Sequence, residues 1–231
     1  MFIGHFALGF AAKRVAPQTS LGTLFLAAQF VDLLWPTLLL LGVERVAIDA
    51  ALSGAPLVFV HYPISHSLLG AIGWAGVLGM VYFAVSHQRR GAWVVALLVA
   101  SHWVLDLLVH RADLPLLLAG GPRLGLGLWD SPGVAQVLEV ALFLACFAVY
   151  LRTPAGKGAG LKPWVLSAAL LAIQIANAVG PPPPSMEAIA WVGQAQWLLV
   201  AAGYWADRPT RGRRGLQAGA AVGGRPFGAG R

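Results

Sequence analysis

The sequence has few of the residues that make a water-soluble protein. Only 11% of its 231 residues are charged, whereas 58% are hydrophobic. Soluble domains carry about 25% charged residues, so this composition excludes an ordinary water-soluble core. There is a single cysteine, Cys146, which excludes an internal disulfide and a metal site built from cysteines. The sequence also lacks a serine or cysteine nucleophile arrangement and a glycine-rich phosphate loop.

Long apolar runs are what the chain has instead. A run of about 20 apolar residues is long enough to cross a bilayer, and we expect an all-α fold, a polytopic integral membrane helical bundle. The first apolar stretch, 2–12, is too short to cross and is predicted to be a re-entrant or interfacial helix. We expect residues 1–206 to form the membrane-embedded domain and 207–231 a disordered, Gly/Arg-rich cytoplasmic tail. The six predicted spans are 21–41, 64–85, 91–109, 133–151, 163–180 and 187–205.

Positive charge is in excess, with a net charge of +7. In a soluble protein this would favour a nucleic-acid partner. Here the basic residues gather in alternate predicted loops and in the tail, which is typical of the positive-inside rule. We therefore expect no nucleic acid and place both termini in the cytoplasm. The start, MFIGHFALGFAAKR, carries its charges after the apolar stretch, so a cleaved signal peptide is not expected.

Histidines and carboxylates lie inside the apolar runs. A helix rises about 1.5 Å per residue. With this rise, the histidines and carboxylates of five spans or half spans are expected between the centre and the outer surface of the bilayer. His102 and Asp106 are four residues apart and share one helix face. A charge in hydrocarbon costs about 2.5–3.5 kcal/mol on insertion scales. No lysine or arginine lies at this depth, so a divalent metal is the cation expected to neutralise the carboxylates.

We therefore predict a metal site inside the bundle. Imidazole and carboxylate ligands without thiolate suit zinc first, and manganese or iron as alternatives. Glu139 or Asp32 is the candidate catalytic general base. The groups expected beside the ligands are His61, His110 and Gln29. The predicted metal ligands are His5, Asp32, His66, His102 and Asp106.

The order of these motifs resembles a known family. The early GHFALGF, the aspartate of QFVDLLWP, then HSLLG and SHWVLD are similar to the bacterial membrane-bound metal-dependent hydrolases, also described as LexA-binding, inner-membrane-associated hydrolases. The resemblance covers roughly residues 1–115 and implies a metal-dependent hydrolase of the bacterial inner membrane. Asp32 stands alone where that family often has paired acids, and Ser65 stands in place of a threonine. The order of histidines and aspartates is also similar to the all-helical zinc phospholipase C and nuclease group, which implies phosphoester cleavage.

Three functions remain open at this point. The first is a hydrolase acting on a lipid-linked phosphoester or ester, because the site is expected at acyl-to-headgroup depth. Its partners would be membrane lipid and a small-molecule or lipid-linked substrate. The second is a transport or proton-relay protein, because membrane chains of histidine and carboxylate also mark ion paths. The third is a structural protein whose polar groups hold helices together. The oligomeric state is not predicted.

Overall fold

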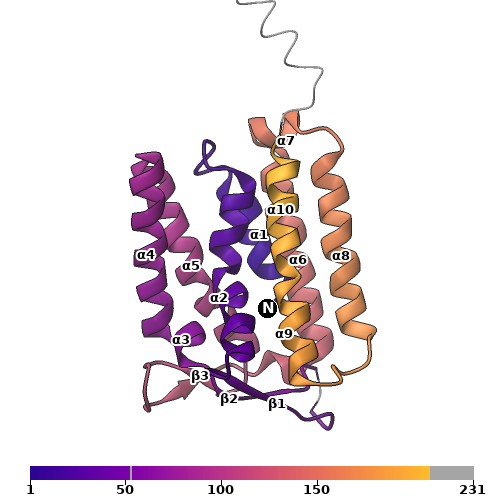
Figure 1. Ribbon diagram of the computed structural model, residues 1–231. Coiled ribbons are helices and arrows are strands. Elements are labelled where there is room, and N and C mark those ends of the chain that lie inside the picture. The colour runs from indigo at the N-terminus through magenta and orange to yellow at the C-terminus, as the bar shows by residue number, and fades with distance from the viewer. Residues whose placement is uncertain (53, 209–231) are drawn as a thin grey trace, which may run out of the picture.

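A bundle of helices with two small sheets across one end makes up the fold (Figure 1), seen here in a computed structural model that describes residues 1–52 and 54–208. The all-α class is confirmed. The predicted tail lies outside the described residues from 209 onward. The helices are α1 (Ile3–Ala12), α2 (Leu21–Leu40), α3 (Pro63–His66), α4 (Leu68–Ser86), α5 (Arg89–Val109), α6 (Pro132–Leu151), α7 (Pro154–Gly158), α8 (Lys162–Val179), α9 (Met186–Gln194) and α10 (Gln196–Ala206).

Five of these helices, α2, α4, α5, α6 and α8, are long and apolar enough to cross a membrane. They correspond to the first five predicted spans. The sixth, 187–205, differs from the prediction because it is two consecutive helices, α9 and α10, separated at Ala195. The Leu198 N–H donates to the Ala195 carbonyl over 3.0 Å, a three-residue step that tightens the turn.

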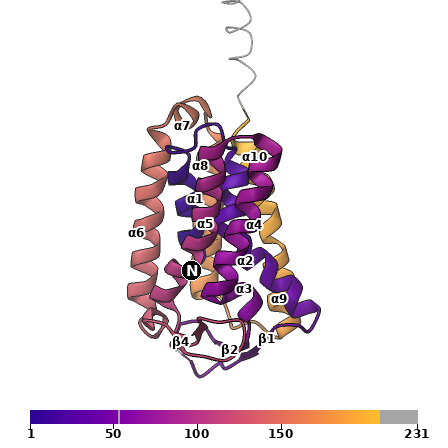
Figure 2. The same cartoon turned by 90° about the vertical axis from the view of Figure 1, so that its left-hand side faces the viewer.

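Helix α1 is a half-length helix inside the bundle. Its first residues lie at mid-height, and it runs toward the end that carries α7 (Figures 1 and 2). It packs mainly against α6 and α2, and its apolar side chains Ile3, Phe6 and Phe10 are fully buried. Residues 3–12 therefore form a helix buried within the bundle, and its predicted placement relative to the membrane stays a prediction.

Aromatic side chains fill the part of the bundle around α1. Phe10 makes edge-on contacts with Phe25 at 4.9 Å and with Phe147 and Tyr150 at 5.1 Å between ring centroids. This geometry is favourable for aromatic pairs. We call this group the aromatic cluster: Phe6, Phe10, Phe25, Phe143, Phe147 and Tyr150.

Two segments predicted as plain loops, 42–63 and 110–132, contain short antiparallel hairpins. Strand β1 (Arg45–Ile48) pairs with β2 (Leu57–His61), and β3 (Leu114–Pro115) pairs with β4 (Arg123–Leu124). The Arg123 guanidinium donates to the carbonyls of Phe59 and Val60, both at 3.3 Å, which ties the second hairpin to the first. The hairpins lie across the end of the bundle opposite α7 (Figure 1).

Candidate metal centre

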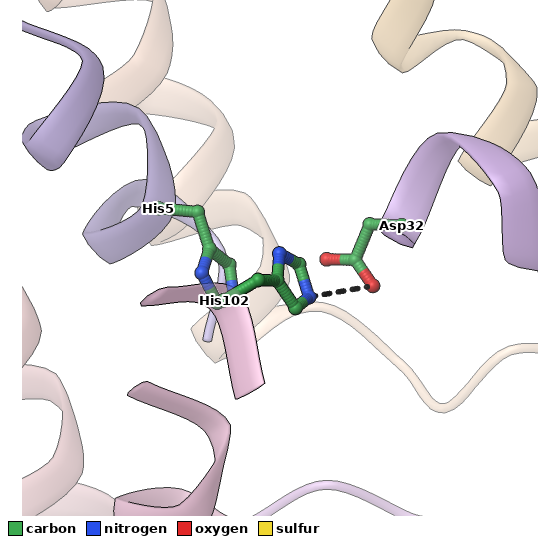
Figure 3. Close-up of side chains that lie close together, drawn as sticks. All are labelled: His5, Asp32 and His102. Atoms are coloured by element: carbon green, nitrogen blue, oxygen red, sulfur yellow. Dashed lines mark ion pairs between the residues drawn. The ribbon is translucent and has the colours of Figure 1, made fainter. Parts of the chain in front are cut away.

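Side chains from α1, α2, α3 and α5 converge on one place in the bundle. The ligand atoms of His5, Asp32 and His102 lie within 4.8 Å of one another, and those of His66, His102 and Asp106 form a second, overlapping group. Figure 3 shows the first group, with an ion pair between His102 and Asp32. The structure thus brings together the five residues predicted as ligands, although they lie up to 101 positions apart in the chain.

Four distances between carboxylate oxygens and imidazole nitrogens connect Asp32, Asp106, His66 and His102. Asp32 Oδ1 lies 3.3 Å from His66 Nε2 and 3.6 Å from His102 Nε2. Asp106 Oδ2 lies 3.2 Å from His102 Nε2 and 3.8 Å from His66 Nε2. Zinc binds nitrogen and oxygen at about 2.0–2.2 Å, so a tetrahedron around it has edges of about 3.3–3.6 Å. The four oxygen-to-nitrogen distances, 3.2–3.8 Å, are close to these edges, so these side chains are candidate ligands of a divalent ion.

The hydrogen bonds of His102 leave its Nε2 available as a metal ligand. Its Nδ1 lies 2.9 Å from the Ala28 carbonyl, and a carbonyl only accepts, so Nδ1 carries the proton. Nε2 is buried and has no hydrogen-bond partner. In the protonated ring this atom forms the ion pairs with Asp32 and Asp106. In the neutral ring it directs a lone pair at both carboxylates, and a cation between them would relieve the repulsion. A metal-binding histidine is usually oriented in this way, by a carbonyl or carboxylate on its other nitrogen.

His66 is oriented by a carboxylate that the sequence analysis did not identify. Ser65 Oγ donates to Glu44 Oε2 over 2.5 Å, so it accepts from His66 Nδ1 over 2.7 Å, and Nε2 is left facing Asp32. Glu44 is fully buried, and its other oxygen accepts from the N–H groups of Ile64 at 2.8 Å and Ser65 at 2.9 Å. The available signal is an acidic residue directly before strand β1.

His110, at the edge of the candidate metal centre, is also oriented by a carboxylate. Its Nδ1 donates to Asp113 Oδ1 over 2.9 Å, and its Nε2 lies 3.9 Å from Asp106 Oδ2. The Tyr62 hydroxyl donates to the same Asp113 oxygen over 3.0 Å. Burial and the Asp113 carboxylate raise the pKa of Tyr62, so the hydroxyl keeps its proton. His110 therefore lies beside the ligands, where the sequence analysis expected it, and Asp113 is an orienting group that it did not anticipate.

The second oxygen of Asp106 faces a different set of atoms. Oδ1 lies 3.1 Å from His5 Nε2 and 2.6 Å from the α-amino group of Met1. The rings of His5 and His102 stack with their centroids 3.6 Å apart. The cation beside Asp106 is thus an α-amino group and not the lysine or arginine side chain whose absence was expected. With neutral histidines, one ammonium beside the two carboxylates, Asp32 and Asp106, leaves a net negative charge.

Glu139 lies outside the ligand group. Its Oε1 accepts from the N–H groups of Phe2 and Gly4, the latter at 3.1 Å, and its Oε2 accepts from the Gln174 amide at 3.2 Å. The first N–H groups of a helix have no partner within it and attract negative charge. The carboxylate thus holds the start of α1, and its predicted role as a base stays a prediction.

The other predicted neighbours of the site separate into two cases. Gln29 donates to Asp32 Oδ2 over 3.2 Å, as the spacing of three residues indicates, and its amide also contacts Gln196 of α10. His61 is exposed at the end of β2, where it lines a small cavity of about 70 Å³ with Arg123. The structure does not bring His61 to the candidate metal centre.

Comparisons with known proteins do not assign the chain to a family. No family model matches it, and no curated protein or solved structure matches it. The resemblance to membrane-bound metal-dependent hydrolases stays a prediction from the motifs, and the functional argument depends on the geometry of the site.

Proposed function

We propose that this protein is a membrane-embedded, metal-dependent hydrolase that holds a divalent ion with Asp32, His66, His102 and Asp106. The buried convergence of these ligand atoms, with oxygen-to-nitrogen distances of 3.2–3.8 Å, is the observation that carries the proposal. Zinc is the best match to the ligand set, and manganese and iron accept the same donors. His5 would supply a fifth ligand if the coordination expands.

The groups at the site would have separate roles in hydrolysis. A divalent ion held here would lower the pKa of a bound water to about 7 and polarise the bond to be cleaved. The Ala28 carbonyl and Ser65 fix the rings of His102 and His66. Asp32 is the best candidate for accepting a proton, because its side chain is 20% exposed while that of Asp106 is 2% exposed.

The proposed substrate is a lipid-linked phosphoester or ester. The site lies inside an apolar bundle, between its middle and the end that carries the hairpins, so a substrate held in the bilayer can reach this depth. Membrane lipid is therefore the expected partner of the protein. A soluble substrate would have to enter past the hairpins.

The two rival functions fit the arrangement less well. A transport or proton-relay protein needs polar groups through both halves of the bundle, but the aromatic cluster fills the core around α1. A structural role for the polar residues would favour scattered hydrogen bonds between helices. The convergence of three histidines and two aspartates supports a site instead.

The proposed location is the bacterial inner membrane, with the α7 end of the bundle in the cytoplasm. Basic residues gather at the loops of this end, including Lys13, Arg14, Arg89 and Arg152, as the positive-inside rule predicts. Single cysteines introduced at 49 and 157 test this orientation with a membrane-impermeant label. Labelling of position 49 from the cytoplasmic side would show that the bundle has the opposite orientation.

The test of the proposed function is the metal content and activity of detergent-purified protein. We expect about one equivalent of zinc per chain and hydrolysis of a chromogenic phosphodiester or carboxylic ester in mixed micelles. The double variant His102→Ala, Asp106→Ala should lose both. The matched control His87→Ala, Asp49→Ala removes the same residue types from exposed positions and should retain both. Negligible metal in the wild type would overturn the proposal.

A further inference from the structure

A cavity of about 500 Å³ lies away from the candidate metal centre, between α4 and α5. Its volume is within the range of about 300–1,000 Å³ for small-molecule sites. A side chain added at Gly76 would meet no atom within 4 Å, so this wall faces open space. We call this cavity the α4–α5 groove, and its lining is Ala75, Gly76, Gly79, Met80, Phe83, Arg89, Ala92, Trp93 and Ala96.

The groove has the length of an acyl chain segment in one leaflet. Its lining extends on α4 from Ala75 to Phe83, a rise of eight residue steps, or about 12 Å along the helix. Half of a hydrocarbon core of about 30 Å is about 15 Å. Apart from Arg89, every lining residue is apolar. The groove therefore matches a lipid tail in depth and in chemistry.

Positive charge lies at one end of the groove. Arg89 is the first residue of α5, and its side chain is exposed. The N-cap residue of α5, Gln88, makes no side-chain cap hydrogen bond, so the positive end of the helix dipole adds to the guanidinium charge. No carboxylate within residues 1–52 and 54–208 forms an ion pair with Arg89. Trp93, 71% exposed, lies one turn further into the helix, as in an interfacial aromatic belt.

We propose that the α4–α5 groove binds one anionic glycerophospholipid, with an acyl chain against Ala75, Gly76 and Gly79 and the phosphate on Arg89. Basic pockets between membrane helices on the cytoplasmic side are known to bind anionic headgroups. The site is separate from the metal centre, shares no residue with it and does not depend on hydrolase activity.

Native mass spectrometry of the full chain in neutral detergent tests this site. The probes are dioleoyl phosphatidylglycerol and dioleoyl phosphatidylcholine, which differ in headgroup charge and have the same tails. We expect the first to bind about fivefold more tightly, because one basic residue near an anionic headgroup supplies that difference. Arg89→Gln should remove the preference while tail binding persists. Gly76→Leu should weaken the binding of both lipids because it fills the groove.

Two matched controls make the result decisive. Arg152→Gln removes another exposed arginine from the same end of the bundle, and Gly73→Leu adds a side chain on α4 in open space outside the groove. Both should bind the lipids as the wild type does. Equal binding of the two lipids to the wild type would overturn the proposal, as would a loss of preference in Arg152→Gln. A dimer that Gly76→Leu dissociates would assign the groove to a second copy of the chain and also overturn it.

Discussion

Helix α1 joins two regions of opposite chemistry within ten residues. Its first turn places His5 against Asp106 and His102, and the next two turns place Phe6 and Phe10 in the aromatic cluster. All of these side chains are buried. Burial has a different consequence in each region, and α1 shows how a half-length helix can hold a histidine in the middle of a bundle.

In the aromatic cluster, burial is stabilising through packing. Lipid tails are as apolar as the cluster, so close contact between rings holds the helices together more than removal from water does. In the metal centre, burial of carboxylates is costly and each polar atom needs a partner. The cluster therefore fixes the position of α1 and of His5, whereas the four proposed ligands lie on α2, α3 and α5.

The largest effect we expect is from Phe10→Ala. Phe10 contacts the rings of Phe25, Phe143, Phe147 and Tyr150, and its truncation should lower the free energy of unfolding by about 3–5 kcal/mol. Thermal unfolding in detergent measures this loss. At temperatures where the variant is folded, its metal content should equal that of the wild type.

The control for that variant is Leu126→Ala, because Leu126 is 71% exposed outside the helices. It should unfold at the same temperature as the wild type. If Phe10→Ala loses its metal while still folded, the two regions are not separable and the comparison fails.

Several features of the fold and the site followed from local sequence. Apolar run length gave five of the spans, and the spacing of four residues placed His102 and Asp106 on one face. The rise per residue placed His5 and Asp32 at a common depth, and the structure brings these two together. These inferences worked because each needs only the geometry of one helix or a shared membrane normal.

The remaining features depend on contacts between distant segments. Glu44 reaches Ser65 because the β1–β2 hairpin folds back on itself, and no local pattern encodes that reversal. The separation of α9 from α10 lies where Gly193 approaches Pro36 so closely that a side chain would overlap it. Such a contact between two helices cannot be read from either segment alone.

A smaller effect is expected from Glu44→Gln. The carboxylate accepts from the backbone with one oxygen and from Ser65 Oγ with the other. The amide of glutamine has only one accepting oxygen and cannot do both, so the orientation of His66 is weakened. Loss of such an orienting group typically lowers metal affinity about 10–100-fold. Competition with a chromophoric chelator measures the affinity, and about one equivalent of metal should still bind at saturation.

Glu187→Gln is the matched control for this variant. Glu187 is exposed in the first turn of α9, and its neutralisation should leave the metal affinity unchanged. A Glu44→Gln protein with wild-type affinity and a lowered melting temperature would show that Glu44 supports the hairpin and does not orient the ligand.

The smallest effect is expected from Glu139→Gln, which tests whether the aromatic cluster is enough to hold α1. The neutral amide loses the attraction of a carboxylate for the helix N-terminus, about 0.3–1 kcal/mol, so metal affinity should fall a few-fold at most. Turnover at saturating metal should stay near the wild-type value. If Glu139 is instead the general base, kcat should fall about 10²–10⁴-fold with metal affinity unchanged. Asp32→Asn, measured beside it, should lower both metal affinity and kcat at saturating metal, because Asp32 is proposed both as a ligand and as the base. A large fall in kcat for Glu139→Gln alone would transfer the role of the base to Glu139.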